Sequence, residues 1–185
     1  MAPPLAGGTK HVAPGNVSGT SGWRSSVLFA SQEDQIRFLR QMVDRYKGAK
    51  DIHDKAIEIV FHEAGCEQKN KFCHALAIGR WVQENITYVN EGVETFQSPS
   101  KSLQYKFGDC DDYATLTAAL LESIGVTAQI VGLQWKGSFR HIFARAVIAG
   151  RIFPLDGTLD EPIDDLTDPI AISTKRGDNP RVLAL

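Results

Sequence analysis

Apolar residues recur at every third or fourth position in three stretches of the N-terminal half of the chain, and this spacing predicts amphipathic helices. The first helix begins at Ser31, which forms a capping-box-like start with Asp34, and it ends at Gly48. The second runs from about residue 51 to 63, and the third from about residue 69 to 85. The pattern therefore predicts a helical N-terminal layer.

A further helix is predicted between Asp109 and Gly125. Asp109 is a good N-cap residue, and Gly125 stands where helices commonly end. Two neighbouring stripes make this helix apolar around most of its girth: Ala114, Thr117, Ala118 and Leu121 form one, and Tyr113, Leu116, Leu120 and Ile124 form the other. A helix of this kind is expected to be buried.

Three stretches predict β-strands, at residues 127–134, 139–148 and 151–156. Ala149 and Gly150 can form a two-residue hairpin turn between the last two strands. That turn places Phe143 opposite Asp156. His141 then lies diagonal to Asp156 on the same face, about 7–8 Å away between backbones, which permits a hydrogen bond between their side chains.

Composition adds the class of molecule. The chain has 185 residues, of which 43% are hydrophobic and 23% are charged, values typical of a single globular domain. The formal net charge is −2, so nothing indicates nucleic acid or an anionic membrane as a partner. No segment approaches the run of about 20 apolar residues that a transmembrane helix needs.

Cys110 is the strongest candidate for chemistry, because it stands at the predicted start of a helix. The helix dipole stabilises a thiolate there and can lower its pKa from about 8.5. The flanking Asp109, Asp111 and Asp112 would raise that pKa if they pointed at the sulfur, so we expect them to turn toward N–H groups or other partners. Cysteine, then His141, then Asp156 suggests a nucleophile with a base and an orienting carboxylate.

These residues resemble the transglutaminase-like superfamily of papain-like cysteine enzymes. The similarity runs from about residue 78 to 158 and includes three segments, at residues 81–88, 108–114 and 120–126. The resemblance implies an α+β fold with a papain-like core, in which the nucleophile helix packs on an antiparallel sheet. It also implies Cys110 as nucleophile, His141 as base and Asp156 as orienter, and no cofactor or metal.

Two glutamines are candidates to stabilise the oxyanion of such a reaction beside the backbone N–H of Cys110. Gln104 stands six residues before the cysteine, which is the papain spacing. Gln97 lies in residues 94–99, which look most like the subgroup found in bacteriophages and prophages. Both glutamines remain candidates at this stage.

Two other cysteines and two histidines invite a metal-site interpretation: His62, Cys66, Cys73 and His74. Their spacing fits no common zinc pattern, so we expect Cys66 and Cys73 to be core residues. Three cysteines form no disulfide framework, and the start of the chain lacks the pattern of a secretory signal. Synthesis in a reducing host cytoplasm is therefore expected.

Three regions are predicted: a Gly/Pro/Ser-rich extended arm (1–25), a catalytic domain (26–160) and an irregular C-terminal tail (161–185). The expected function is a phage-encoded, thiol-dependent amide hydrolase or acyl transferase that acts on a protein or peptide through a thioester. The alternative is a structural component of a phage virion that uses the fold as a binding module. In that case the arm would contact phage structural proteins.

Overall fold

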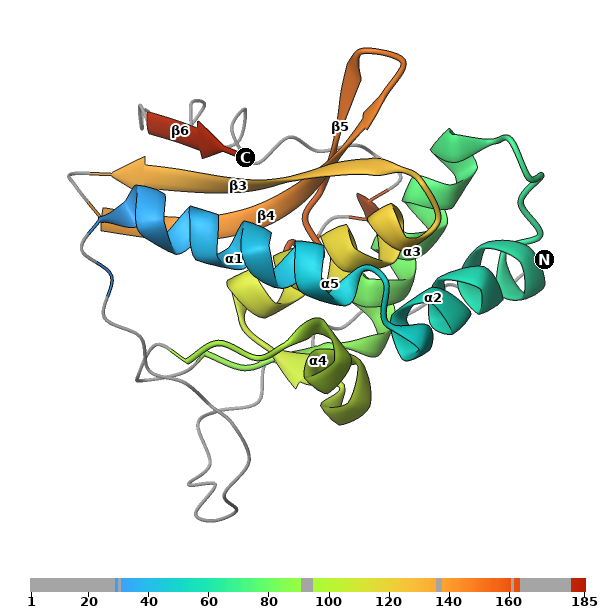
Figure 1. The fold of residues 1–185 in the computed structure, drawn as a ribbon, viewed down its shortest axis with the longest axis horizontal. Helices are drawn as coiled ribbons and strands as arrows, with labels where there is room; N and C mark the ends of the chain where they lie inside the picture. The colour runs from blue at the N-terminus through green and yellow to red at the C-terminus, as the bar shows by residue number, and fades with distance from the viewer. Residues whose placement is uncertain (1–28, 30, 91–94, 136–137, 161, 164–180) are drawn as a thin grey trace.

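The computed structural model describes residues 29, 31–90, 95–135, 138–160, 162–163 and 181–185. The helical elements within these ranges are α1 (Gln32–Tyr46), α2 (Lys50–Ile57), the π-helix η1 (Glu58–Glu63), α3 (Lys71–Asn85), α4 (Pro99–Tyr105) and α5 (Cys110–Ser123). α5 is central, since it contacts α1 to α4 as well as the sheet (Figure 1). No helix in the described ranges is long and apolar enough to cross a membrane.

The predicted helix ends are confirmed where the sequence carries a capping signal. The Ser31 hydroxyl accepts from the backbone N–H of Asp34 at 3.2 Å and donates to the Asp34 carboxylate at 2.8 Å. Gly65 follows η1 and Gly125 follows α5 with φ angles of 63° and 77°, a backbone conformation that glycine adopts without strain. The second predicted helix is thus α2 and η1 together.

The main sheet has the strand order β5-β4-β3-β6 and is antiparallel throughout. Its strands are β3 (Thr127–Trp135), β4 (Ser138–Ile148), β5 (Arg151–Leu155) and β6 (Arg181–Ala184), and a separate parallel pair is formed by β1 (Thr87–Tyr88) and β2 (Phe107–Gly108). Ala149 and Gly150 both have positive φ, as a type I′ hairpin turn requires. Ala144 pairs with Leu155, so the predicted register is confirmed.

The α+β fold class is confirmed, with α5 buried against the sheet as expected. Leu116, Leu120 and Leu121 of α5 are fully buried in the main core. The other face of the sheet carries a smaller cluster of Val131, Leu133 and Phe143. His141 pairs with Leu133, so it lies on the face of this smaller cluster.

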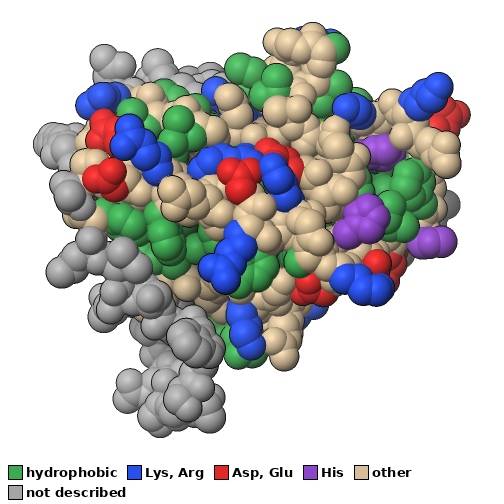
Figure 2. Space-filling model, viewed as in Figure 1, with side chains coloured by type: hydrophobic (Ala, Val, Ile, Leu, Met, Phe, Trp, Pro, Cys, Tyr) green, Lys and Arg blue, Asp and Glu red, His purple; other side chains and the backbone are tan. Residues whose placement is uncertain are grey.

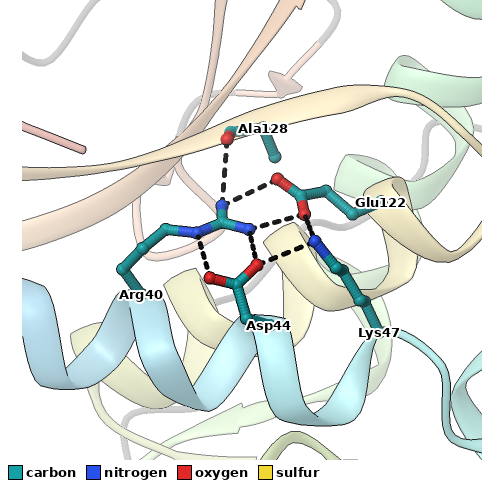
Figure 3. A network of polar contacts seen from close by, with 5 residues as sticks. All are labelled: Arg40, Asp44, Lys47, Glu122 and Ala128. Carbon is teal, nitrogen blue, oxygen red and sulfur yellow. Dashed lines mark hydrogen bonds and ion pairs between the residues drawn. The ribbon is translucent and has the colours of Figure 1, made fainter.

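A charged network joins α1 to the last turn of α5 and to the start of β3 (Figure 3). The Arg40 guanidinium donates to both Glu122 oxygens, at 2.7 and 2.5 Å, and to the carbonyl of Ala128 at 3.2 Å. Asp44 accepts from Arg40 and from Lys47, each at 2.7 Å. Acidic and basic side chains accordingly interleave over α1 on the face shown in Figure 2.

The prediction of an irregular tail over 161–185 is wrong at its end. Arg181–Ala184 form β6, which pairs antiparallel with β3. Leu185 and Ile130 exchange two backbone hydrogen bonds, at 2.8 and 3.1 Å. The physical reason is that β3 would otherwise present an unpaired edge. Residues 164–180 and the predicted arm, 1–25, lie outside the described residues.

Cys66 lies in the main core and Cys73 packs against it, as predicted. The expectation that the cysteines form no disulfide is wrong, because these two are bridged, with Cα atoms 5.8 Å apart. The backbone N–H of Cys66 donates to the Val60 carbonyl at 2.7 Å, which turns the chain back toward the start of α3. The bridge leaves neither sulfur available as a thiolate ligand. Since disulfides are typical of oxidising environments, the cysteine count no longer supports a reducing cytoplasm.

Candidate active site

Cys110 is the first residue of α5 and lies half-buried against the main core. Asp109 is the N-cap residue of α5, as predicted, with an extended backbone, although its side chain makes no capping hydrogen bond. Its carbonyl accepts the first hydrogen bond of the helix, from the backbone N–H of Tyr113 at 3.0 Å. The thiol therefore lies at a helix end whose first N–H groups have no partner within the helix.

The carboxylate of Asp112 is buried and held by neutral amides. It accepts from the backbone N–H of Gln97 and from the Gln97 side-chain amide, both at 2.8 Å. A Cβ on Gly108 would lie 2.6 Å from the Cβ of Asp112, so the approach of Asp112 requires glycine there. The expectation that the flanking carboxylates turn toward N–H groups is confirmed for Asp112.

His141 and Asp156 meet as the strand register predicted. The Nε2 atom of His141 is hydrogen-bonded to Oδ2 of Asp156, whose side chain is 1% exposed against 21% for His141. The other oxygen, Oδ1, accepts from the backbone N–H of Thr158 at 3.1 Å and from its hydroxyl at 2.7 Å. Thr158 thus fixes the carboxylate, and Nδ1 is the ring nitrogen left for a reacting group.

An aromatic ring covers the imidazole. The Phe143 and His141 rings are stacked, with centroids 5.9 Å apart and planes at 14°. Phe143 is 2% exposed. A buried ring at this position shields one side of the His141–Asp156 hydrogen bond from water, and this strengthens its electrostatic component.

The turn after β5 contacts the segments on either side of Cys110. A Cβ on Gly157 would lie 3.0 Å from the Tyr113 ring, in the first turns of α5. The Tyr113 hydroxyl donates to the carbonyl of Ile86, and the Gln83 side-chain amide donates to the carbonyl of Leu159 at 2.8 Å. These contacts place the Asp156 turn beside the start of α5.

Tyr88 is a site residue that the sequence reasoning missed. It pairs with Gly108 in the β1–β2 ladder, and its ring lies 6.1 Å from that of Tyr113. Burial raises the pKa of Tyr88 to about 12, with further contributions from the negative charges of Cys110, Asp109 and Asp156. Tyr88 therefore lies within electrostatic range of both Cys110 and Asp156. The available signal was its position at the end of the segment 81–88.

The two glutamines proposed as oxyanion donors lie in different surroundings. Gln97 is buried, and its side-chain amide donates to the carbonyl of Phe107 at 3.1 Å as well as to Asp112. Both N–H bonds of that amide are therefore engaged. Gln104 is exposed on α4, where its oxygen accepts from Lys101 at 3.2 Å. The oxyanion role of each glutamine stays a prediction, and the contacts of Gln97 favour a structural role.

A helix that begins at a cysteine, packed on an antiparallel sheet that carries a paired histidine and aspartate, is the arrangement of papain-like proteins. The chain belongs to the transglutaminase-like domain family, whose model matches residues 55–168. The comparison with curated proteins gave no match.

Solved structures show the same fold. A candidate cysteine protease from Cytophaga hutchinsonii has a TM-score of 0.51 at 19% identity, over 80% of this chain and 55% of that protein. A candidate protease from Parabacteroides distasonis has a TM-score of 0.60 at 14% identity, over 84% of this chain and 30% of that protein. The chain thus spans about half and about a third of their lengths. At these identities the likeness shows the fold alone.

Proposed function

We propose that this chain is a thiol-dependent hydrolase or acyl transferase with Cys110 as nucleophile, His141 as base and Asp156 as orienter. The observation that carries the proposal is the buried Asp156, which contacts His141 through one oxygen and Thr158 through the other. A carboxylate held on both sides fixes the tautomer and orientation of the imidazole. The approach of Nδ1 to the Cys110 sulfur stays a prediction.

The proposed reaction has two steps. His141 takes the thiol proton at Nδ1 while the Cys110 sulfur forms a bond to the substrate carbonyl carbon and the carbonyl electron pair moves to oxygen. When the carbonyl re-forms, the bond to the leaving amine breaks and His141 delivers the proton to that nitrogen. In the second step, water or a second amine attacks the thioester carbonyl carbon while Nδ1 of His141 takes its proton. The C–S bond then breaks and the proton returns to the Cys110 sulfur, which gives hydrolysis or acyl transfer.

A protein or peptide substrate is part of the proposal, supported by the description of both structural neighbours as candidate proteases. Encoding by a phage remains a proposal from the likeness of residues 94–99. The rival function, a virion component that binds through its arm, depends on residues 1–25, which lie outside the described residues.

The test is the rate at which iodoacetamide alkylates Cys110 as a function of pH. Because Cys66 and Cys73 are bridged, Cys110 is the thiol that reacts in the folded protein. We expect rapid labelling near neutral pH, slower labelling in His141→Ala and none in Cys110→Ala. A rate that follows an ordinary thiol with a pKa of about 8.5, and that His141→Ala leaves unchanged, would show that the pair does not activate the thiol.

A further inference from the structure

The proposed reaction needs a second oxyanion donor, and the contacts of the two predicted glutamines favour neither of them for that role. Both N–H bonds of the Gln97 side-chain amide are used, by Asp112 and by Phe107. Gln104 is exposed on α4. This leaves room for a donor on another element, beside the backbone N–H of Cys110.

We propose that the Tyr88 hydroxyl donates the second hydrogen bond to the oxyanion, which makes Tyr88 a catalytic residue. This inference rests on the proposed function and names a group for its transition state. Tyr88 reaches the site through β1, an element separate from the helix and strands that carry the nucleophile, the base and the orienter.

Backbone pairing fixes the position of Tyr88. The β1–β2 ladder sets it opposite Gly108, and the N–H of Val89 donates to the Gly108 carbonyl at 2.9 Å. Gly108 lies two residues before Cys110 in the chain. The Tyr88 ring also lies 6.1 Å from that of Tyr113, in the first turns of the nucleophile helix. The ring is thus held from both the strand and the helix that lead into Cys110.

The chemistry of the phenol suits the role. With its pKa raised to about 12 by burial and by nearby negative charge, Tyr88 keeps its proton at neutral pH and can donate it in a hydrogen bond. The charges of Asp109, Asp111 and Asp156 that act on Tyr88 would also oppose a new negative charge on a substrate oxygen. A neutral hydrogen-bond donor to that oxygen is therefore most needed close to these carboxylates.

Two reactions of the same thiol separate this role from activation of the thiol. With p-nitrophenyl acetate, the sulfur bonds to the carbonyl carbon, the carbonyl pair moves to oxygen, and the bond to p-nitrophenolate breaks as the carbonyl re-forms. With iodoacetamide, the sulfur displaces iodide from a CH₂ carbon and no oxyanion forms. A lost oxyanion donor should slow the first reaction only.

We expect Tyr88→Phe to lower the rate of acylation by about 100-fold and to leave alkylation within about twofold of the wild type, since one donor contributes on that scale. The matched control is Tyr105→Phe, which removes the same hydroxyl from an exposed tyrosine of α4 and should leave both rates unchanged. Wild-type acylation in Tyr88→Phe would overturn the inference. An equal loss of acylation and alkylation would also overturn it, because the hydroxyl would then act on the thiol.

A second measurement uses the wild-type protein, in case Tyr88→Phe fails to fold. An aldehyde such as acetaldehyde adds to the Cys110 thiol, with a new C–S bond and the thiol proton moved to the former carbonyl oxygen. In a crystal structure of this adduct, that oxygen should lie about 3 Å from the Tyr88 hydroxyl. An oxygen turned away from Tyr88 would overturn the inference alone. Equal acylation of the wild type and Cys110→Ala would overturn the proposed function, and this inference with it.

Discussion

The two ends of α5 satisfy their carboxylates in different ways. At the C-terminal end, Glu122 is held by two cations, with Arg40 at 2.5 Å and Lys47 at 3.0 Å. At the N-terminal end, Asp112 is held by the neutral amides of Gln97. The ion pairs neutralise the charge of Glu122, whereas the two hydrogen bonds from Gln97 bring no opposite charge to Asp112.

We therefore expect the C-terminal end of α5 to contribute mainly to stability, and the N-terminal end to reactivity. Cations near the C-terminal end complement the helix dipole and connect α1, α5 and β3. At the other end, the carboxylates share the positive end of the dipole with the thiol of Cys110. Changes at the C-terminal end should therefore alter unfolding, and changes at the N-terminal end should alter reactivity.

The largest contrast is expected between Cys110→Ala and Leu120→Ala. Cys110→Ala should abolish alkylation and change the free energy of unfolding by less than about 1 kcal/mol, because the side chain is small and half-buried. Leu120→Ala should cost about 2–5 kcal/mol, since it leaves a cavity at a fully buried position. Urea denaturation and iodoacetamide labelling measure the two effects. Equal destabilisation by both changes would mean that Cys110 is a core residue.

At the C-terminal end, Arg40→Ala should lower the free energy of unfolding by about 1–3 kcal/mol, because it removes a charged donor from the largely buried Glu122. Lys47→Ala is the matched control at a more exposed cation and should cost under about 1 kcal/mol. Alkylation of Cys110 should be unchanged in both. Slower alkylation in Arg40→Ala would show that the C-terminal end of α5 also affects the reactivity of Cys110, which would contradict the contrast.

The same network predicts how stability responds to acid. Hydrogen bonds from Arg40 and then Lys47 lower the pKa of Asp44 to about 2. Although burial raises the pKa of Glu122, hydrogen bonds from the same two cations lower it overall. A lowered carboxyl pKa contributes stability above its ordinary value of about 4, and this stability is lost as the pH falls toward 2.

Denaturation curves at a series of pH values between about 5 and 2 test this expectation. The wild type should lose stability steadily over that range, and Arg40→Ala should lose less, because the pKa values of its carboxyls return toward ordinary ones. Parallel losses in the two proteins would show that other carboxyl groups dominate the acid response.

The smallest effect is expected from Thr158→Val, which removes the hydroxyl that donates to Asp156 at 2.7 Å. The backbone N–H of residue 158 remains, so Asp156 keeps one of the two donors. Alkylation of Cys110 at neutral pH should slow by about threefold to tenfold, the worth of one hydrogen bond. Thr158→Ser keeps the hydroxyl and should restore the rate. If both variants react like the wild type, Thr158 has no positioning role.

Much of the frame was predictable because its signals are local. Ser31 and Asp34 define the start of α1, and the positive-φ pair at Ala149 and Gly150 sets the register that brings His141 to Asp156. Each of these signals lies within a few residues of the feature that it determines.

The features that were missed depend on contacts between distant segments. β6 exists because residues 181–184 meet the edge of β3, and Tyr88 joins the site through a parallel pairing with residue 108. The Cys66–Cys73 bridge needs the chain reversal after η1. Gln97 was predicted as a site residue, but its hydrogen bonds to Asp112 were not predicted. The close packing of Asp112 against this segment cannot be deduced from the spacing of residues in the sequence.

The contact between Gly108 and Asp112 gives the motif around Cys110 two separate origins. Glycine is required by the packing of Asp112 and cysteine by the proposed reaction, so the two positions would be under independent selection. A descendant that exchanged Cys110 for serine or alanine would still need Gly108 and Asp112 to build the start of the helix. The Gly-Asp-x-Asp-Asp pattern in a genome would therefore identify the architecture. The residue at its centre would distinguish a protein that carries the proposed nucleophile from one that keeps the fold without it.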